Sequence, residues 1–135
     1  WQTRGIDAGD GSGDISEVVQ ACAQKFNNVV IASGEVDYIS DGKRVTTVHN
    51  NTKLLPAIVG SGDLLSSVAG AFSAVADDPF DAAVVASLEL SCAGERAAAK
   101  LDHQNLPGSF LNFLLDELAN ITPEQVEKIM KVGEQ

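Results

Sequence analysis

An uninterrupted run of apolar residues in the segment NVVIAS, residues 28–33, limits the folds open to this chain. A strand of this kind is apolar on both faces, which is typical of a parallel sheet covered by helices. The preceding segment, 14–26, has apolar residues at the spacing of a helix with one buried face. These residues are Ile15, Val18, Val19, Cys22 and Phe26. The two segments together predict an α/β protein with a strand buried on both faces.

The rest of the chain predicts a hairpin followed by helices. Asp41-Gly42 is a two-residue hairpin signal between strands at 36–39 and 44–48. The segment LPGS at 106–109 is expected to interrupt the chain between helices. Four helices are predicted after the hairpin, at 63–76, at 80–101, after 109 and, with a capping box, from Thr122 onward. Only about three strands are recognisable, fewer than an average helix-covered sheet contains.

Length and charge narrow the class of protein further. The 135 residues, 44% of them hydrophobic and 21% charged, fit one soluble globular domain. A net charge of −10 argues against nucleic acid or an anionic membrane as partner, because both require a basic surface. No apolar run approaches the ~18 residues of a membrane span. Cys22 and Cys92 lie in apolar helical patterns, which predicts buried reduced thiols and a cytoplasmic protein.

The segment Gly60-Ser61-Gly62-Asp63 predicts an anion site at the start of a helix. Glycines leave backbone amides uncovered, and the first turn of a helix adds N–H groups without partners. The segment lacks the Gly-Lys-Ser/Thr of a phosphate loop and the GxGxxG of a dinucleotide fold. Phosphoryl transfer to an alcohol requires such donors together with a base. Asp63 is therefore interpreted either as that base or as a helix cap alone.

Seven segments carry a more specific pattern. They are GIDAG at 5–9, SGEVD at 33–37, SDG at 40–42, HN at 49–50, LL at 54–55, GSGDLLSSVAGAF at 60–72 and PGSF at 107–110. Taken in this order, they resemble the motifs of the hydroxyethylthiazole kinase family of thiamine salvage. The resemblance implies an α/β, ribokinase-like three-layer fold, and residues 1–135 are expected to be the C-terminal portion of a single kinase domain.

The resemblance also implies a reaction and residue roles. The family phosphorylates 4-methyl-5-(2-hydroxyethyl)thiazole with ATP and Mg²⁺. The backbone of Gly60, Ser61 and Gly62 is expected to form an anion hole, and Gly60 is also expected to contact the alcohol. Asp63 is expected to accept the hydroxyl proton, and Ser33, at a strand end, is expected to bind ATP phosphates. The family further implies a homotrimer with the thiazole sites at its interfaces.

The sequence departs from the family pattern at three positions. Many members carry cysteine where Asp63 stands, whereas the wider superfamily uses aspartate. Because a carboxylate is ionised at neutral pH, this difference is expected to preserve a base. Val59 and Thr52 replace a usual threonine and histidine, which affects the details of substrate and nucleotide contacts more than the type of reaction.

The chain is expected to be part of a longer protein, because it begins at Trp1 and its only methionine is Met130. A missing N-terminal half is expected to supply the acidic residues that organise Mg²⁺ and a basic contact for ATP. No metal ligand is expected within residues 1–135. Since phosphoryl transfer depends on such electrostatic contacts, residues 1–135 alone are expected to be inactive.

Two other functions remain open from the sequence. The first is a ribokinase-like kinase for another small alcohol of the pyridoxal or hydroxymethylpyrimidine type, which Asp63 would fit equally well. The second is a non-catalytic oligomerising module that keeps the fold without the Mg²⁺ contacts.

Several other acidic residues have a structural and a functional interpretation. Glu35 and Asp37 are expected either to form structural hydrogen bonds or to approach a metal–nucleotide complex. Asp7, Asp10 and Asp14 lack the spacing of a calcium loop, so turn and cap roles are predicted for them.

Overall fold

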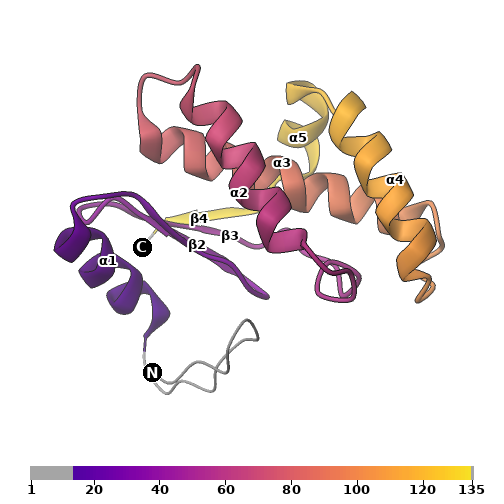
Figure 1. The fold of residues 1–135 in the computed structure, drawn as a ribbon, viewed down its shortest axis with the longest axis horizontal. Coiled ribbons are helices and arrows are strands. Elements are labelled where there is room, and N and C mark those ends of the chain that lie inside the picture. Colours follow the sequence, from indigo (N-terminus) through magenta and orange to yellow (C-terminus); the bar gives the residue numbers. More distant parts are fainter. Residues whose placement is uncertain (1–13, 135) are drawn as a thin grey trace.

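The computed structural model describes residues 14–134 and contains five helices and one four-stranded sheet (Figure 1). The segment GIDAG, Asp7 and Asp10 lie outside the described residues. The strands follow the order β1-β2-β3-β4, and each pairs antiparallel with the next. The elements are α1 (Ile15–Phe26), β1 (Val30–Ala32), β2 (Asp37–Ser40), β3 (Val45–Val48), α2 (Ser61–Ser73), α3 (Pro79–Ala99), α4 (Pro107–Asn120), α5 (Pro123–Ile129) and β4 (Val132–Glu134).

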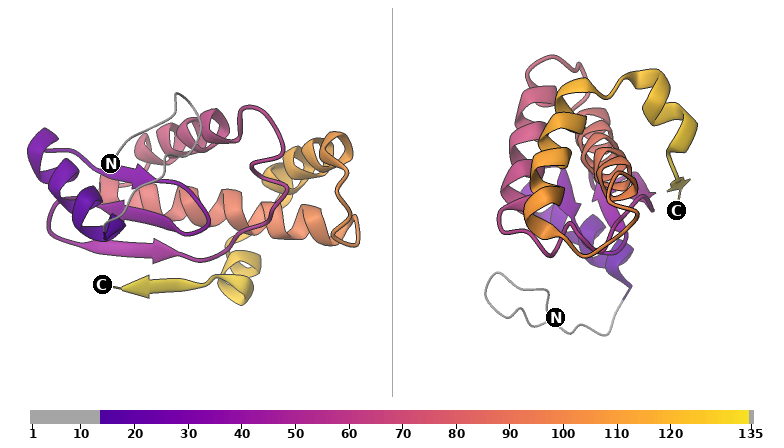
Figure 2. Two further views of the ribbon diagram at one scale, coloured as in Figure 1. Left: turned by 90° about the horizontal axis from the view of Figure 1, so that it is seen from below. Right: turned by 90° about the vertical axis from the view of Figure 1, so that its right-hand side faces the viewer.

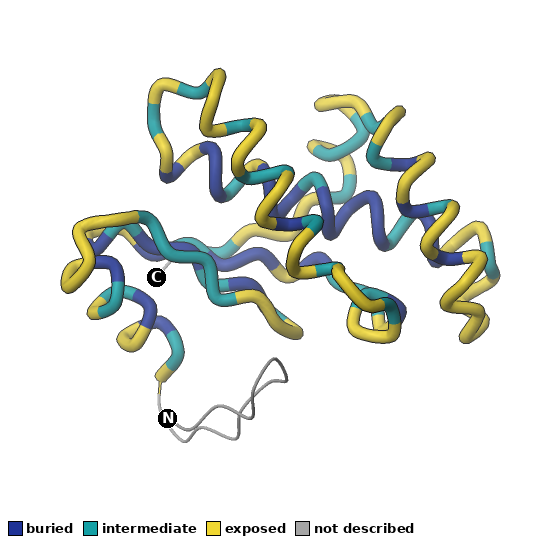
Figure 3. Tube along the Cα trace, viewed as in Figure 1, coloured by how far each residue is buried: buried dark blue, intermediate teal, exposed yellow. Residues whose placement is uncertain are grey.

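Helices cover both faces of the sheet, which confirms the predicted α/β layering. Helix α1 packs on β1 and β2, whereas the long helix α3 packs on β2 and β3 from the opposite face (Figure 2). Helices α2 and α4 then pack against α3. Helix α3 is therefore the central element, and Figure 3 shows its buried residues running through the middle of the molecule.

Two groups of apolar side chains form the core on the α3 side of the sheet. The first joins α2, α3 and α4 and includes Leu65, Leu90 and Phe110. The second joins the sheet to α3 and includes Ile39 and Phe80. Helix α3 contributes alanines to both groups, and small side chains allow the helices and strands to approach one another closely.

The prediction of a strand buried on both faces is wrong for residues 28–33. Strand β1 covers only Val30–Ala32, is antiparallel to β2 and has half-buried side chains throughout. It lies at the edge of the sheet, with no second neighbouring strand among residues 14–134. An edge position leaves apolar side chains partly open, so the sequence pattern overstated their burial here.

The predicted buried face of α1 is correct only in part. Val19 and Ala23 are buried, but Val18 is 47% exposed and Phe26 is 67% exposed. The reason is that α1 reaches only β1 and β2, so its remaining apolar side chains border an open groove. The Asp14 cap is confirmed, since its side chain accepts a hydrogen bond from the Ser16 amide at 3.0 Å.

Three of the remaining helices begin at proline. Asp78 caps α3 by accepting from the Phe80 amide at 2.9 Å, with Pro79 as the first helical residue. The expected break between helices is confirmed, but it lies at 100–106 rather than at 106–109, because Pro107 occupies the first turn of α4. The capping box at the start of α5 is confirmed, and there Gln125 Oε1 accepts from the Thr122 amide at 3.1 Å.

The hairpin is confirmed with a longer connection than predicted. Ser40 pairs with Val45, so four residues rather than two form the turn, and Gly42 adopts a positive φ of 90° within it. Strand β4 was not predicted. It pairs with β3 through Val48 and Val132, and it completes the sheet from the opposite end of the chain.

Candidate active site

The segment 60–63 begins helix α2 two residues earlier than predicted. Gly60 is the N-cap, with φ 90° and ψ 9°, a left-handed conformation that glycine adopts without strain. Ser61 and Gly62 then form the first turn, and Asp63 is the third helical residue. Since α2 has no side-chain capping hydrogen bond, the interpretation of Asp63 as the helix cap is wrong.

The first backbone amides of α2 are free. The earliest amide of this helix with a backbone acceptor is that of Leu64, which donates to the Gly60 carbonyl at 2.9 Å. The amides of Ser61, Gly62 and Asp63 have no hydrogen-bond acceptor among residues 14–134. Three such N–H groups at the positive end of a helix dipole form a site suited to an anion.

Asp63 lies beside these amides with an exposed side chain. Its Oδ2 atom is 4.0 Å from the place that a Cβ atom on Gly60 would occupy, so the carboxylate turns back over the start of the helix. The described residues provide no hydrogen bond to this carboxylate. It is therefore available to accept a proton from a group placed near Gly60.

A cavity of about 510 Å³ separates the start of α2 from the turn that follows β1. We call it the α2 cavity. Ser61 and Gly62 line it from one side, and Ser33, Gly34 and Glu35 line it from the other. The structure thus brings Ser33 and two residues of the predicted anion hole to one cavity. Gly60 and Asp63 do not line this cavity and lie at the adjacent exposed surface.

Asp37, at the start of β2, holds the turn that carries Ser33. Its Oδ1 atom accepts a hydrogen bond from the Gly34 amide at 3.0 Å, and its Oδ2 atom accepts one from the Ser87 hydroxyl on α3. Burial raises the pKa of the Asp37 carboxyl, while the hydrogen bonds from Ser87 and Gly34 oppose that rise. Asp37 therefore has the hydrogen-bonded structural role that was one of its two interpretations.

A second polar network holds the loop between β3 and α2, and the sequence analysis missed it. Glu95 on α3 accepts hydrogen bonds from the Asn50 side chain at 3.0 Å, the Asn51 amide at 3.1 Å and Lys131 Nζ at 2.8 Å. Burial acts to raise the pKa of Glu95, but these three donors outweigh it and the pKa is lowered. Because Asn51 lines the α2 cavity, this network fixes part of the cavity wall.

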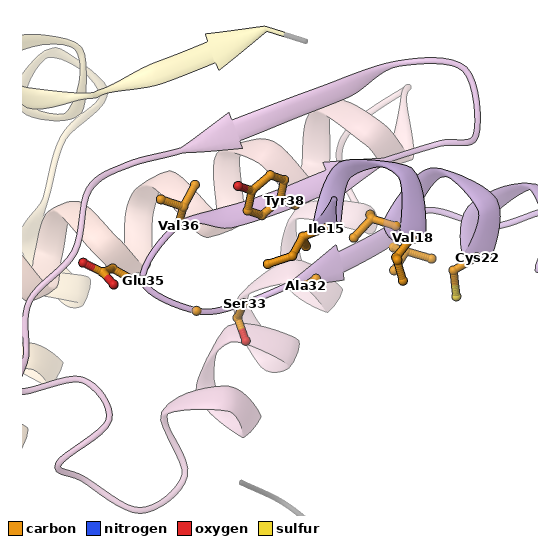
Figure 4. Close-up of a pocket in the computed structure, with 11 residues that line it drawn as sticks. Ile15, Val18, Cys22, Ala32, Ser33, Glu35, Val36 and Tyr38 are labelled. Atoms are coloured by element: carbon orange, nitrogen blue, oxygen red, sulfur yellow. The ribbon is translucent and has the colours of Figure 1, made fainter. Parts of the chain in front are cut away.

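A second hollow, the α1 groove, lies between α1 and strands β1 and β2 (Figure 4). Its volume is about 500 Å³, and its walls are mainly apolar, with Val18, Cys22 and Tyr38 among them. Ser33 lies at the end of this groove, and in Figure 4 its hydroxyl points away from Tyr38. No sequence pattern singled out this groove, because its walls come from segments separated along the chain.

The described residues contain no group of three or more His, Cys, Asp or Glu side chains placed to bind a metal ion. Glu35, an exposed residue that lines both hollows, is the acidic group at the mouth of the α2 cavity. Cys92 is buried and burial raises its pKa to about 11, so its thiol stays protonated, whereas Cys22 is only half-buried. Among residues 14–134, no helix has the length and apolar character needed to cross a membrane.

A sequence model of the hydroxyethylthiazole kinase family matches residues 1–124. The chain belongs to the hydroxyethylthiazole kinase family. It is 81% identical, over 99% of its length, to 51% of the hydroxyethylthiazole kinase of Pediococcus pentosaceus. It is 49% identical, over 98% of its length, to 50% of that of Lactiplantibacillus plantarum. The chain thus spans about half the length of these hydroxyethylthiazole kinases.

A solved structure agrees with this membership. The hydroxyethylthiazole kinase protein from Pyrococcus horikoshii OT3 superimposes with a TM-score of 0.83 at 33% sequence identity. The match covers 90% of this chain and 46% of that one. The predicted ribokinase-like fold is therefore confirmed for the part of the fold that the chain contains.

Proposed function

We propose that residues 1–135 are the C-terminal part of a single ribokinase-like kinase domain. The complete protein then transfers a phosphoryl group from ATP to the alcohol of 4-methyl-5-(2-hydroxyethyl)thiazole. One observation carries the proposal: three free amides begin α2 at the wall of a cavity that Ser33 also lines. Free amides and a hydroxyl are the donors that stabilise a migrating phosphoryl group.

Each site residue has a role in this reaction. The amides of the anion hole, formed by Gly60, Ser61 and Gly62, stabilise charge on the phosphoryl group. Ser33 donates a hydrogen bond to the ATP phosphates from the opposite wall of the α2 cavity. Asp63 accepts the proton of the substrate hydroxyl, which contacts the Gly60 backbone.

The positions of the α2 cavity and of Asp63 fit an in-line transfer of the phosphoryl group across the anion hole. The α2 cavity is of a size that holds small ligands, so the phosphates of ATP fit on that side of the amides. Asp63 lies at the exposed surface beside Gly60, which leaves the alcohol on the other side. In-line displacement requires the attacking and leaving oxygens on opposite sides of the phosphoryl group.

The residues of the α2 cavity fit ATP together with Mg²⁺ better than free phosphate. Backbone amides, the Ser33 hydroxyl and Lys53 are phosphate ligands at this cavity, but Glu35, which lines it too, repels an anion. A divalent cation reduces that repulsion and neutralises charge on the phosphates when bound. The acidic residues that organise the cation belong to an N-terminal half outside this chain. This N-terminal half is an expected partner of residues 1–135.

The proposed protein is a cytoplasmic homotrimer with thiazole sites at its interfaces. Val59 is fully exposed directly before Gly60, beside the proposed anion hole. Apolar side chains open beside a site are typical of a surface that a partner subunit or an apolar substrate covers. Neither nucleic acid nor a membrane is expected as a partner, because the net charge is −10.

The substrate is tested with the full-length protein that carries this chain. ATP and Mg²⁺ are supplied with the thiazole alcohol, pyridoxal or hydroxymethylpyrimidine, and ADP formation is followed. We expect kcat/KM for the thiazole alcohol to exceed the others by about 100-fold or more, as for a site built around one substrate. A preference for another alcohol would assign the protein to that substrate. A protein that binds no ATP in calorimetry and forms no ADP would instead be a non-catalytic oligomerising module.

A further inference from the structure

Asp37 is a buried carboxylate without a role in the proposed chemistry. Its residue is 7% exposed, and it lies at the first position of β2, paired with Val48 of β3. Burying a charged group is costly unless hydrogen bonds compensate for the lost water. Asp37 therefore occupies a position where an apolar or neutral side chain would avoid that cost.

The contacts of Asp37 connect the Ser33 turn to the buried helix α3. One carboxylate oxygen receives the Gly34 amide at 3.0 Å, and the other receives the Ser87 hydroxyl. Ser87 is fully buried on α3, the helix at the centre of the fold. Hydrogen bonds to a charged acceptor are stronger than those between neutral groups, so this link holds the turn firmly against α3.

The rest of the turn has little to hold it. Ser33, Gly34 and Glu35 are exposed, and they follow the last residue of an edge strand. Glu35 makes one further contact, in which its carbonyl accepts a hydrogen bond from the Asn51 side chain at 3.1 Å. The position of Ser33 at the α2 cavity thus depends strongly on the Gly34 amide that Asp37 binds.

We propose that Asp37 is a positioning residue, which holds the Ser33–Gly34 turn so that the Ser33 hydroxyl faces the phosphates of ATP. This inference rests on the proposed function, because it assigns Ser33 to ATP. Asp37 itself lines the α2 cavity, but its two carboxylate oxygens are engaged by Gly34 and Ser87. The inference adds that Asp37 acts through Ser33, and on ATP rather than on the alcohol. Asp63 and the anion hole lie on α2 and are independent of the turn.

The test measures ATP·Mg²⁺ affinity by calorimetry and KM for both substrates in the full-length protein. Asp37→Ala is expected to weaken ATP binding by about tenfold, the usual effect of losing one or two hydrogen bonds, while KM for the alcohol changes by less than about twofold. Asp37→Asn is expected to restore most of the affinity, because its amide can accept from Gly34 and donate to Ser87. Ser87→Ala removes one contact only and is expected to weaken ATP binding less than Asp37→Ala does.

The deciding comparison is a double-mutant cycle with Ser33→Ala. If Asp37 acts through Ser33, Asp37→Ala has little further effect on ATP affinity once Ser33 is alanine. Glu117→Ala is the matched control, since it removes a buried carboxylate on α4 and is expected to leave ATP affinity unchanged.

Independent effects of the two substitutions, or equal changes in KM for both substrates, would overturn the inference and leave Asp37 with a purely structural role. If Asp37→Ala does not fold, Ser87→Ala takes its place in the double-mutant cycle with Ser33→Ala, and the same comparison of ATP affinities decides between the two roles. A wild-type protein that binds ATP but phosphorylates none of the alcohols would contradict the proposed function, while the affinities would still test Asp37.

Discussion

Gly60 shows how a single residue can determine both the start of a helix and the shape of a site. Its φ of 90° places the backbone in the left-handed region, and a Cβ atom at this position would lie in ordinary contact with the Asp63 carboxylate, at 4.0 Å from Oδ2. Any other residue would strain the backbone at this position. The stability of α2 and the chemistry proposed for its first turn therefore depend on the same glycine.

Gly60→Ala is expected to lower the free energy of unfolding by about 1–2 kcal/mol, the cost of a side chain in a left-handed conformation. We also expect slower turnover, because the added Cβ atom would stand beside the backbone that the alcohol is proposed to contact. Gly70 is the control, since it lies inside α2 with open space around it. Gly70→Ala is expected to raise stability by about 0.5–1 kcal/mol in the same urea titrations. Equal effects of the two substitutions would contradict this account.

The residues of the site differ in how far the sequence could reveal them. Gly60 to Asp63 were predicted because four consecutive residues carry the pattern, although the helix starts earlier than expected. The role of Glu95 was missed, since its contacts with Asn50 and Asn51 span 45 and 44 positions. Asp37 was noticed as an acidic residue at a bend, but its contact with Ser87 spans 50 positions. Only the fold shows which distant partner binds a carboxylate.

At the scale of elements, α3 and α4 are joined by an ion-pair network around Glu117. This carboxylate is 4% exposed, and it accepts from Lys100 Nζ at 2.6 Å and from Arg96 Nε. Burial acts to raise the pKa of Glu117, but the hydrogen bonds from Lys100 and Arg96 outweigh it and hold the pKa below 4.5. The ionised form is thus favoured in the folded protein.

Glu117→Gln is expected to lower the free energy of unfolding by about 1–3 kcal/mol at pH 7, because both cations lose their partner. Since the folded pKa is lowered, the stabilisation is present above the ordinary value of 4.5 and is lost as the pH falls through the folded value. Urea titrations across this pH range should show the difference from wild type shrinking at acid pH. Glu127→Gln, at an exposed position of α5, is the control. A constant difference at every pH would contradict the assignment.

Elements that depend on residues close together in sequence were predicted well. Elements that depend on pairing with residues far away in sequence were not. The hairpin, the Asp14 cap and the capping box of α5 depend on residues close together in sequence. By contrast, β4 forms only because Val132 meets Val48 across the sheet. The pattern of β1 showed a strand but not its direction or its edge position, because pairing depends on β2.

At the scale of the whole molecule, the chain spans about half the length of the relatives it matches. Its described residues include the proposed anion hole and the proposed base. Phosphoryl transfer requires charge neutralisation on the phosphates as well as a base. In the proposed function, this chain supplies the base and the N-terminal half supplies the residues that organise Mg²⁺.

Residues 1–135 alone are expected to turn over at least about 100-fold more slowly than the full-length protein, because the contacts that neutralise phosphate charge are lost. ADP formation with the thiazole alcohol, compared at equal site concentration, measures the difference. Circular dichroism of the short chain serves as the control for folding. Comparable turnover by a folded short chain would show that it contains the complete catalytic site.

The central claim is that Asp63 accepts the proton of an alcohol beside the free amides of α2. The most direct measurement is kcat of full-length Asp63→Asn with the thiazole alcohol, next to the ATP affinity of the same protein. We predict that kcat falls by about 100- to 10,000-fold while ATP affinity is unchanged, because only the proton acceptor is removed. Asp77→Asn, at an exposed position beyond the end of α2, is expected to retain full turnover. Full turnover by Asp63→Asn would contradict the claim.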